Sequence, residues 1–251
     1  MSAIVWISTA LGHPSNMRPL KHSFSNAAQE KHGLIWSRRN LDGYPLDAEF
    51  VPQEIWGISS AVERHYKFPH LFAAGNVWVV STAAAAVLRR FDLGAGALYP
   101  VAVMKKDRET PVDGEWLCLN FGNRKSAFLP EQSENAYSDY IRNGEKGWFA
   151  NATLFDGDFA VSAQALAGPD IWIDPDVGDA FFLSEALGKA LKKEKVDKGF
   201  FLNKCRVVVV SAFPETTLDE VFGSMRYEGP ALSLEEMDAA VVREAKRRTR
   251  D

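Results

Sequence analysis

Membrane and secretory signals are missing from this sequence. No apolar run approaches the roughly 18 residues that a membrane-spanning helix needs. The first apolar stretch, residues 3–11, is short, contains Ser8 and Thr9 and has no basic residue before it, so it makes a poor signal peptide. Cysteine is scarce: Cys118 and Cys205 lie in apolar, strand-like runs and, without a secretory signal, are expected to be reduced and buried. These absences predict a cytoplasmic protein that has no contact with a membrane.

The common catalytic motifs are absent as well. There is no GxxxxGKS/T loop for phosphate, and Gly94-Ala95-Gly96 follows a helix-like run and precedes a strand-like one, the wrong order for a dinucleotide site. No GxSxG elbow occurs, and Ser81 and Ser184, each between a strand-like and a helix-like run, suit N-caps better than nucleophiles. The five histidines have none of the close spacings typical of zinc sites. The sequence therefore predicts no cofactor and no metal.

Positive charge is missing from one long window of the chain. Lys and Arg are absent between Gly147 and Gly188, whereas the same window carries seven acids. These acids are Asp156, Asp158, Asp170, Asp174, Asp176, Asp179 and Glu185. Neighbouring carboxylates repel one another, so a fold usually keeps them on a solvated surface or puts them to use.

Four interpretations of this acidic window are open. The acids could bind Ca²⁺, although Asp174-Pro175-Asp176 lacks the ligand spacing and the bidentate glutamate of an EF-hand. They could act as acid and base in a hydrolase, or they could meet a basic partner and speed its association. Alternatively, the aspartates only shape turns, as Asp156-Gly157-Asp158 suggests.

For partner docking, the expected contact residues are grouped around one tryptophan. They are Asp170, Trp172, Asp174, Asp176 and Asp179. An exposed Trp172 ringed by carboxylates would suit an interface hot spot, whereas a buried Trp172 would belong to the core. We predict partner binding through these side chains and no catalytic residue.

Two stretches of the chain share a strand–helix–strand pattern. In the first, a strand at 77–80 leads through the cap Ser81 into a helix and then to a strand at 97–104. The second repeats this order 103 residues later, with Ser184 as the cap and a final strand at 200–210. Both helices carry an apolar stripe at helical spacing and are followed by glycine. Such units predict an α+β protein with a mixed β-sheet.

The remaining segments give further local predictions. Strands are expected at 4–7 and 115–121, and helices at 52–66 and 131–141. A capping box at 233–236 opens a last amphipathic helix with a basic end, which complements the helix dipole. Because no aromatic residues are interleaved with those basic residues for base stacking, no nucleic-acid partner is expected.

The length bounds the domain organisation. A chain of 251 residues can bury a sizeable core without disulfides or a structural metal. We expect a single compact domain over residues 1–251. The polar stretch at 122–147, rich in Ser, Asn and Gly, allows a boundary between two lobes there.

Several short blocks follow one another in the order seen in one known family. They read VVS at 79–81, LRRFDLG at 88–94, YPV at 99–101, GEWLCLNFG at 114–122 with Lys125 after it, ALAGPDIW at 165–172, DP at 174–175, FLS at 182–184, and AL at both 186–187 and 190–191. In these blocks, which fall within residues 76–210, the chain resembles the immunity protein 11 family, formerly a domain of unknown function. No single block is a chemical signature.

The resemblance implies a function in toxin neutralisation. It implies a bacterial, cytoplasmic protein that binds the cognate protein toxin of a polymorphic toxin system and neutralises it without catalysis. It supplies no site residues, and it leaves self-association open. The alternative function is a metal-dependent or acid/base hydrolase that uses the carboxylates between Asp156 and Glu185.

Overall fold

The computed structural model describes residues 3–25, 30–57, 67–141 and 144–209, together with Ser233 and Glu235. By its internal contacts the chain divides into two units, Met1–Val210 and Ser211–Asp251. All elements named below belong to the first unit. The helix predicted to open at 233–236 belongs to the second unit and, apart from those two residues, lies outside the described part of the chain.

The larger sheet has seven strands in the order β2-β5-β6-β8-β7-β4-β3. Their bounds are β2 Met17–Arg18, β3 Leu20–His22, β4 Glu54–Gly57, β5 Leu71–Ala74, β6 Val77–Ser81, β7 Ala97–Met104 and β8 Trp116–Asn120. Only Pro19 separates β2 from β3, so the two edges of this sheet end in one continuous segment. A twisted sheet whose edges meet in this way curls toward a barrel.

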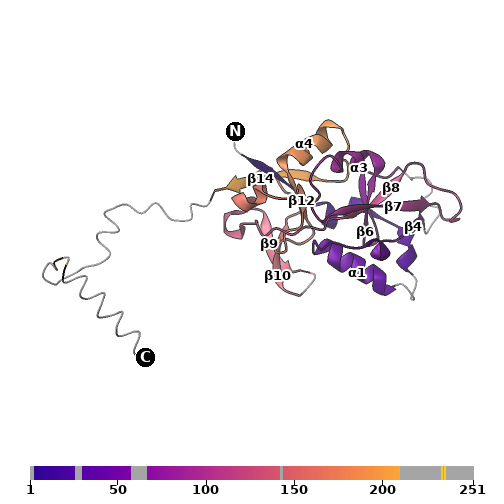
Figure 1. The fold of residues 1–251 in the computed structure, drawn as a ribbon, viewed down its shortest axis with the longest axis horizontal. Coiled ribbons are helices and arrows are strands. Elements are labelled where there is room, and N and C mark those ends of the chain that lie inside the picture. Colours follow the sequence, from indigo (N-terminus) through magenta and orange to yellow (C-terminus); the bar gives the residue numbers. More distant parts are fainter. Residues whose placement is uncertain are drawn as a thin grey trace, which may run out of the picture. The chain divides into compact units, whose positions relative to one another are not determined.

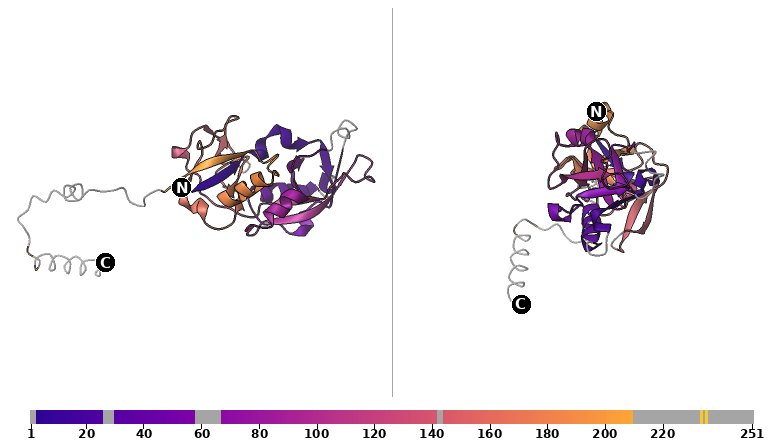
Figure 2. Two further views of the ribbon diagram at one scale, coloured as in Figure 1. Left: turned by 90° about the horizontal axis from the view of Figure 1, so that it is seen from above. Right: turned by 90° about the vertical axis from the view of Figure 1, so that its right-hand side faces the viewer.

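A second sheet has five strands in the order β11-β14-β1-β13-β12. Their bounds are β1 Ile4–Ser8, β11 Ala160–Ser162, β12 Ile171–Trp172, β13 Phe181–Ser184 and β14 Leu202–Val208. Strand β1 is antiparallel to both neighbours, with Trp6 opposite Leu183 on one side and Lys204 on the other. Figure 2 shows β1 beside β14, so the two ends of the first unit form adjacent strands.

The other elements connect and cover these sheets. Strands β9 Ala136–Tyr140 and β10 Lys146–Ala150 form a separate antiparallel pair, which we call the ribbon. Within the described residues the α-helices are α1 Glu30–Leu41, α3 Thr82–Leu88 and α4 Glu185–Lys193. The 3-10 helices are η1 Ala10–Gly12, η2 Pro14–Asn16, η3 Ser23–Ser25, η4 Ala48–Phe50, η5 Pro130–Gln132 and η6 Ala163–Leu166.

The two predicted strand–helix–strand units are present, one in each sheet. Helix α3 leads from β6 to β7, which run parallel on either side of the antiparallel β8; α4 leads from β13 to β14, which flank β1 in the same way. The Ser81 and Ser184 hydroxyls accept the amides of Ala84 and Leu187, each at 3.2 Å, so both predicted N-caps are confirmed. The α+β class with mixed sheets is confirmed, although the units belong to two sheets rather than one.

Alternation along the strands sorts the core into layers. In β6, Trp78 faces a central cluster that also holds residues of α3 and α4, while Val79 faces the interior of the curled sheet. In β13, Leu183 faces the same central cluster and Phe182 faces a third cluster beyond the five-stranded sheet. Figure 1 shows α3 and α4 side by side, and the two helices are in contact. The central cluster therefore joins the two sheets through their helices.

Two helix predictions were wrong. Residues 131–141 contain η5 and β9, because Tyr137 and its neighbours pair with β10 rather than closing helical turns. Within the helix predicted at 52–66, residues 54–57 form β4, whose Ile55 lies between His22 of β3 and Val103 of β7; residues 58–66 lie outside the described part. In both segments pairing with a distant strand outweighed a local helical pattern.

The structure also bears on the two cysteines and on membrane-spanning helices. Cys118 and Cys205 are buried and unpaired, as expected, and burial raises the pKa of both thiols. Among the helices that the structure describes, none is long and apolar enough to cross a membrane.

Candidate functional site

Residues 174–179 form a tight turn that packs against the ribbon, and we call this segment the acidic turn. The amide of Trp148 in β10 donates to the carbonyl of Asp176 at 2.8 Å, and the amide of Gly178 donates back to the carbonyl of Trp148 at 2.7 Å. The turn ends at Asp179, whose φ of +53° lies in the left-handed region that aspartate tolerates better than most residues. These bonds fix the turn as a lateral extension of the ribbon.

Asp174 holds the acidic turn from inside. Its side chain is 1% exposed, and its Oδ2 accepts the amides of Ala127 and Phe128 at 2.7 and 2.8 Å. Its Oδ1 accepts the amide of Asp176 at 3.1 Å. Burial raises the pKa of the Asp174 carboxyl, and the three amide bonds offset part of that rise. Asp174 therefore ties the turn to residues 127–128 and does not face solvent.

Trp172 and Asp170 are also tied into the structure. The Trp172 side chain is 0% exposed, and the ammonium of Lys125 lies 3.7 Å from its ring centroid. Burial lowers the pKa of Lys125 to about 8, while Asp170 and Asp92 act in the opposite direction. Asp170 accepts the amide of Asp92 at 2.8 Å. Trp172 is thus a core residue, and the exposure that an interface hot spot requires is not met.

The other acids of the window find partners that the local sequence did not suggest. Asp156 forms an ion pair with Lys204 at 3.2 Å, and Glu185 forms one with Lys189 at 2.5 Å. Asp158 accepts the amide of Phe155 at 2.7 Å. The window itself contains no Lys or Arg, and the cations that pair with Asp156 and Glu185 come from beyond it. Asp156, Asp158, Asp174 and Glu185 thus hold turns or ion pairs. The described part of the chain has no cluster of three or more side chains suited to a metal.

The ribbon presents aromatic side chains next to the acidic turn. Tyr137 of β9 stacks on its cross-strand neighbour Phe149, with ring centroids 5.6 Å apart and an angle of 21° between the planes. Tyr137 is 47% exposed and Tyr140 is 67% exposed. Large aromatic rings that remain accessible beside carboxylates are typical of binding surfaces rather than cores.

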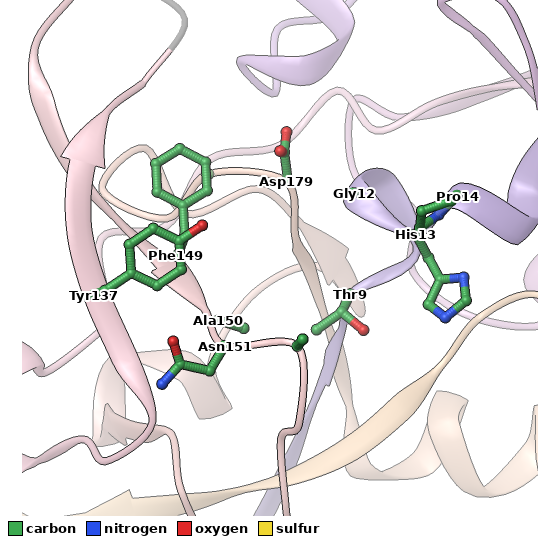
Figure 3. A pocket seen from close by; sticks show the side chains of 11 residues that line it. Thr9, Gly12, His13, Pro14, Tyr137, Phe149, Ala150, Asn151 and Asp179 are labelled. Carbon is green, nitrogen blue, oxygen red and sulfur yellow. The ribbon is translucent and has the colours of Figure 1, made fainter.

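A pocket of about 270 Å³ lies between the ribbon, the acidic turn and the segment that follows β1. Its polar and aromatic lining residues are Thr9, His13, Tyr137, Phe149, Asn151 and Asp179. In Figure 3 the two rings from the ribbon lie together on one side, His13 lies on the other, and the Asp179 carboxylate lies between them. His13 is held by stacking on Phe201, with centroids 3.7 Å apart, and by a 2.7 Å hydrogen bond between its Nδ1 and the Ser15 hydroxyl.

Glycine permits the close packing around this pocket. A Cβ atom at Gly178 would lie 2.2 Å from the ring of Phe149, so only glycine lets the acidic turn approach the ribbon so closely. The resulting wall of aromatic rings beside a carboxylate suits a cationic or guanidinium side chain.

The structure therefore divides the five predicted contact residues into two groups. Asp176 and Asp179 are exposed on the acidic turn, and Asp179 also lines the pocket. Trp172 and Asp174 are buried and Asp170 is partly exposed, and all three are tied into the structure by the contacts described above. That Asp176 and Asp179 meet a partner stays a prediction.

Sequence reasoning missed the aromatic part of this site. Tyr137 was assigned to a helix, Phe149 was not considered, and His13 was weighed only as one of five histidines that could bind zinc. One signal was available, because Asn143-Gly144 between two aromatic-containing runs is a strong hairpin indication. The position of His13 beside the ribbon had no local signal, since it depends on tertiary packing.

Comparison with protein families gives a match. The sequence model of an immunity protein family, Imm11, matches residues 59–207, which is more than half of the 251-residue chain. The matched range contains both crossover helices, the ribbon and the acidic turn. No curated protein matches the chain.

Proposed function

Since the chain belongs to the Imm11 immunity protein family, we propose that it binds a cognate bacterial toxin and neutralises it stoichiometrically, without catalysis. The family match is the observation that carries this proposal. The toxin belongs to a polymorphic toxin system, and the two proteins meet in the bacterial cytoplasm.

The charge distribution supports a basic partner. Residues 131–179 contain ten Asp and Glu but only two Lys and Arg, although the whole chain has a net charge of only −4. Some of this charge is neutralised by Lys125 and Lys204, whereas Asp176 and Asp179 face solvent. A surface of one sign attracts a partner of the opposite sign and raises its association rate.

The test is a titration of toxin activity. The probe is the toxin domain encoded by the gene adjacent to that of this chain, produced in a heterologous bacterial host with and without the chain. We expect co-expression to restore growth and the purified proteins to form a complex of defined stoichiometry. Toxin activity should fall linearly with added protein and reach zero at the stoichiometric point.

Two outcomes would contradict the proposal. Failure of the chain to restore growth or to bind the toxin would remove the binding function. Loss of toxin activity at far less than one equivalent of the chain would indicate turnover, and therefore an enzyme. A thermal-shift series with Ca²⁺, Mg²⁺, Mn²⁺ and Zn²⁺ tests the hydrolase alternative separately, because a large rise with one metal would favour it.

A further inference from the structure

Strand β9 forms one edge of the ribbon. Within the described residues it pairs only with β10, and Tyr137 to Tyr140 are all exposed. An edge strand of this kind offers backbone donors and acceptors to another chain.

The register shows which backbone groups face outward. The amide of Ile141 donates to the carbonyl of Glu145, and the amide of Asn151 donates to the carbonyl of Asn135. Hydrogen-bonded pairs alternate along an antiparallel ladder, so Tyr137 and Asp139 also bond to β10. The amide and carbonyl of Ser138 therefore point away from β10, at the outer edge.

The side chains along this edge indicate what kind of strand would fit. Tyr137 and Asp139 lie on one face of β9, because side chains alternate along a strand. The ring of Tyr137 and the carboxylate of Asp139 would both lie beside a residue of an added strand on that face. A guanidinium at that position could stack on the ring and pair with the carboxylate. Opposite charges on neighbouring strands stabilise the pairing.

From these observations we infer that the free edge of β9 is the toxin-docking edge, and that the toxin adds an extended segment bearing an arginine beside Tyr137 and Asp139. This inference rests on the proposed function and names the surface and the partner chemistry. Backbone bonds to Ser138 give the added segment its register, and the arginine gives it selectivity. The excess of acids in residues 131–179 directs the basic segment to this edge.

The test compares edge variants in the full-length protein, with the adjacent-gene toxin domain as the probe. Ser138→Pro removes the outward amide, and proline is tolerated on edge strands. Tyr137→Ala removes the ring. Asp139→Lys reverses the charge and also removes the carboxylate oxygen that accepts the amide of Tyr140 at 2.7 Å. We expect S138P and Y137A each to weaken binding at least about tenfold, and D139K to slow association about tenfold and reduce its salt dependence.

The matched controls separate the edge from its surroundings. Ser138→Ala keeps the amide, and Asp113→Lys places the same charge change on an exposed loop between β7 and β8. Both should bind within about twofold of the unaltered protein. Asp179→Asn tests the pocket behind Tyr137 and should weaken binding less than S138P does.

Hydrogen exchange gives a readout that does not depend on substitution. Complex formation should slow exchange in peptides covering residues 136–140. If the unaltered protein binds while exchange at 136–140 is unchanged, or if D179N weakens binding more than S138P, the edge inference is overturned and the proposed function stands. Failure of the unaltered protein to bind would overturn both.

Discussion

Helix α3 crosses from β6 to β7 and contacts β8, and helix α4 crosses from β13 to β14 and contacts β1. Both helices begin after a capping serine and bury one face in the same central cluster. The two units differ on the far side of their sheets. Beyond the first sheet the strands curl round an interior cluster that α1 and the segment after it also enter, whereas beyond the second the cover consists of loops, the ribbon and the acidic turn.

This difference indicates which side of the molecule can carry a binding surface. A sheet that curls toward a barrel encloses one of its own faces and leaves less of that face for irregular segments to cover. The second sheet is covered by segments held with individual hydrogen bonds, such as those of Asp174, and these segments carry the exposed rings and acids. Binding residues are commonly placed on irregular segments that a rigid scaffold supports.

The strongest test of the likeness between the two units concerns the matched leucines. Leu88 and Leu191 stand 103 residues apart at the same position of α3 and α4, and both are 0% exposed in the central cluster. We expect Leu88→Ala and Leu191→Ala each to lower the free energy of unfolding by about 2–5 kcal/mol, because each leaves a cavity. Chemical denaturation measures both values. Lys193→Ala, at an exposed position of α4, is the control; its free energy of unfolding should stay within about 0.5 kcal/mol of that of the unaltered protein. A leucine variant that loses less than about 1 kcal/mol would show that its helix packs loosely.

The next largest effect concerns the cover of the second sheet. Asp174→Ala leaves the amides of Ala127 and Phe128 without their acceptor and should cost about 2–4 kcal/mol of unfolding free energy. Since the folded-state pKa of Asp174 is raised, its contribution is largest below the unfolded pKa of about 3.9 and declines as the pH rises through the folded pKa. The cost should therefore be larger at pH 4 than at pH 7. The exposed Asp176→Ala is the matched control; an equal loss in both variants would show that Asp174 has no special anchoring role.

The parts of the fold that sequence predicted are those with local causes. Ser81 and Ser184 were identified as caps because the signals of an N-cap lie within one turn of the helix. The strands on either side of each helix were also found. These features repeat at a fixed offset, so each supports the interpretation of the other.

The parts that sequence missed depend on distant partners. Strand β4 forms because Ile55 pairs with Val103, and the helical pattern around Pro52 gives no sign of that contact. The charge around each acid was inferred from the residues next to it in the sequence. Asp156, however, pairs with Lys204, which is 48 residues away in the sequence and is brought beside it by the fold. Exposure of Asp176 and Asp179, and burial of Trp172, likewise follow from packing that no local pattern encodes.

A smaller effect tests one position where the two units must differ. Position 85 in α3 is alanine, and the matched position in α4 is Gly188, where a Cβ atom would lie 2.2 Å from Cδ1 of Trp6. Replacing glycine by alanine inside a helix ordinarily raises the free energy of unfolding by up to about 1 kcal/mol. Here we expect Gly188→Ala to destabilise the protein by about 1–3 kcal/mol, because the side chain overpacks against the indole. Thermal unfolding of G188A, and of G188A with Trp6→Phe, measures this. If G188A destabilises the protein less when Trp6 is replaced by Phe, the strain lies at the contact between position 188 and Trp6. If G188A alone stabilises the protein, there is no strain at this contact.

The smallest expected effects compare the two caps themselves. Ser184→Ala removes one cap bond and should cost about 1 kcal/mol. Ser81→Ala should cost more, by about 0.5–1.5 kcal/mol, because the Ser81 hydroxyl also forms a 2.7 Å hydrogen bond with Nδ1 of His70. Denaturation of both variants at pH 8 gives the difference. Ser184→Asp keeps a capping oxygen and should restore most of the loss. If the two alanine variants lose the same free energy, the His70 contact adds nothing, and the units are equivalent at their caps as well as in their topology.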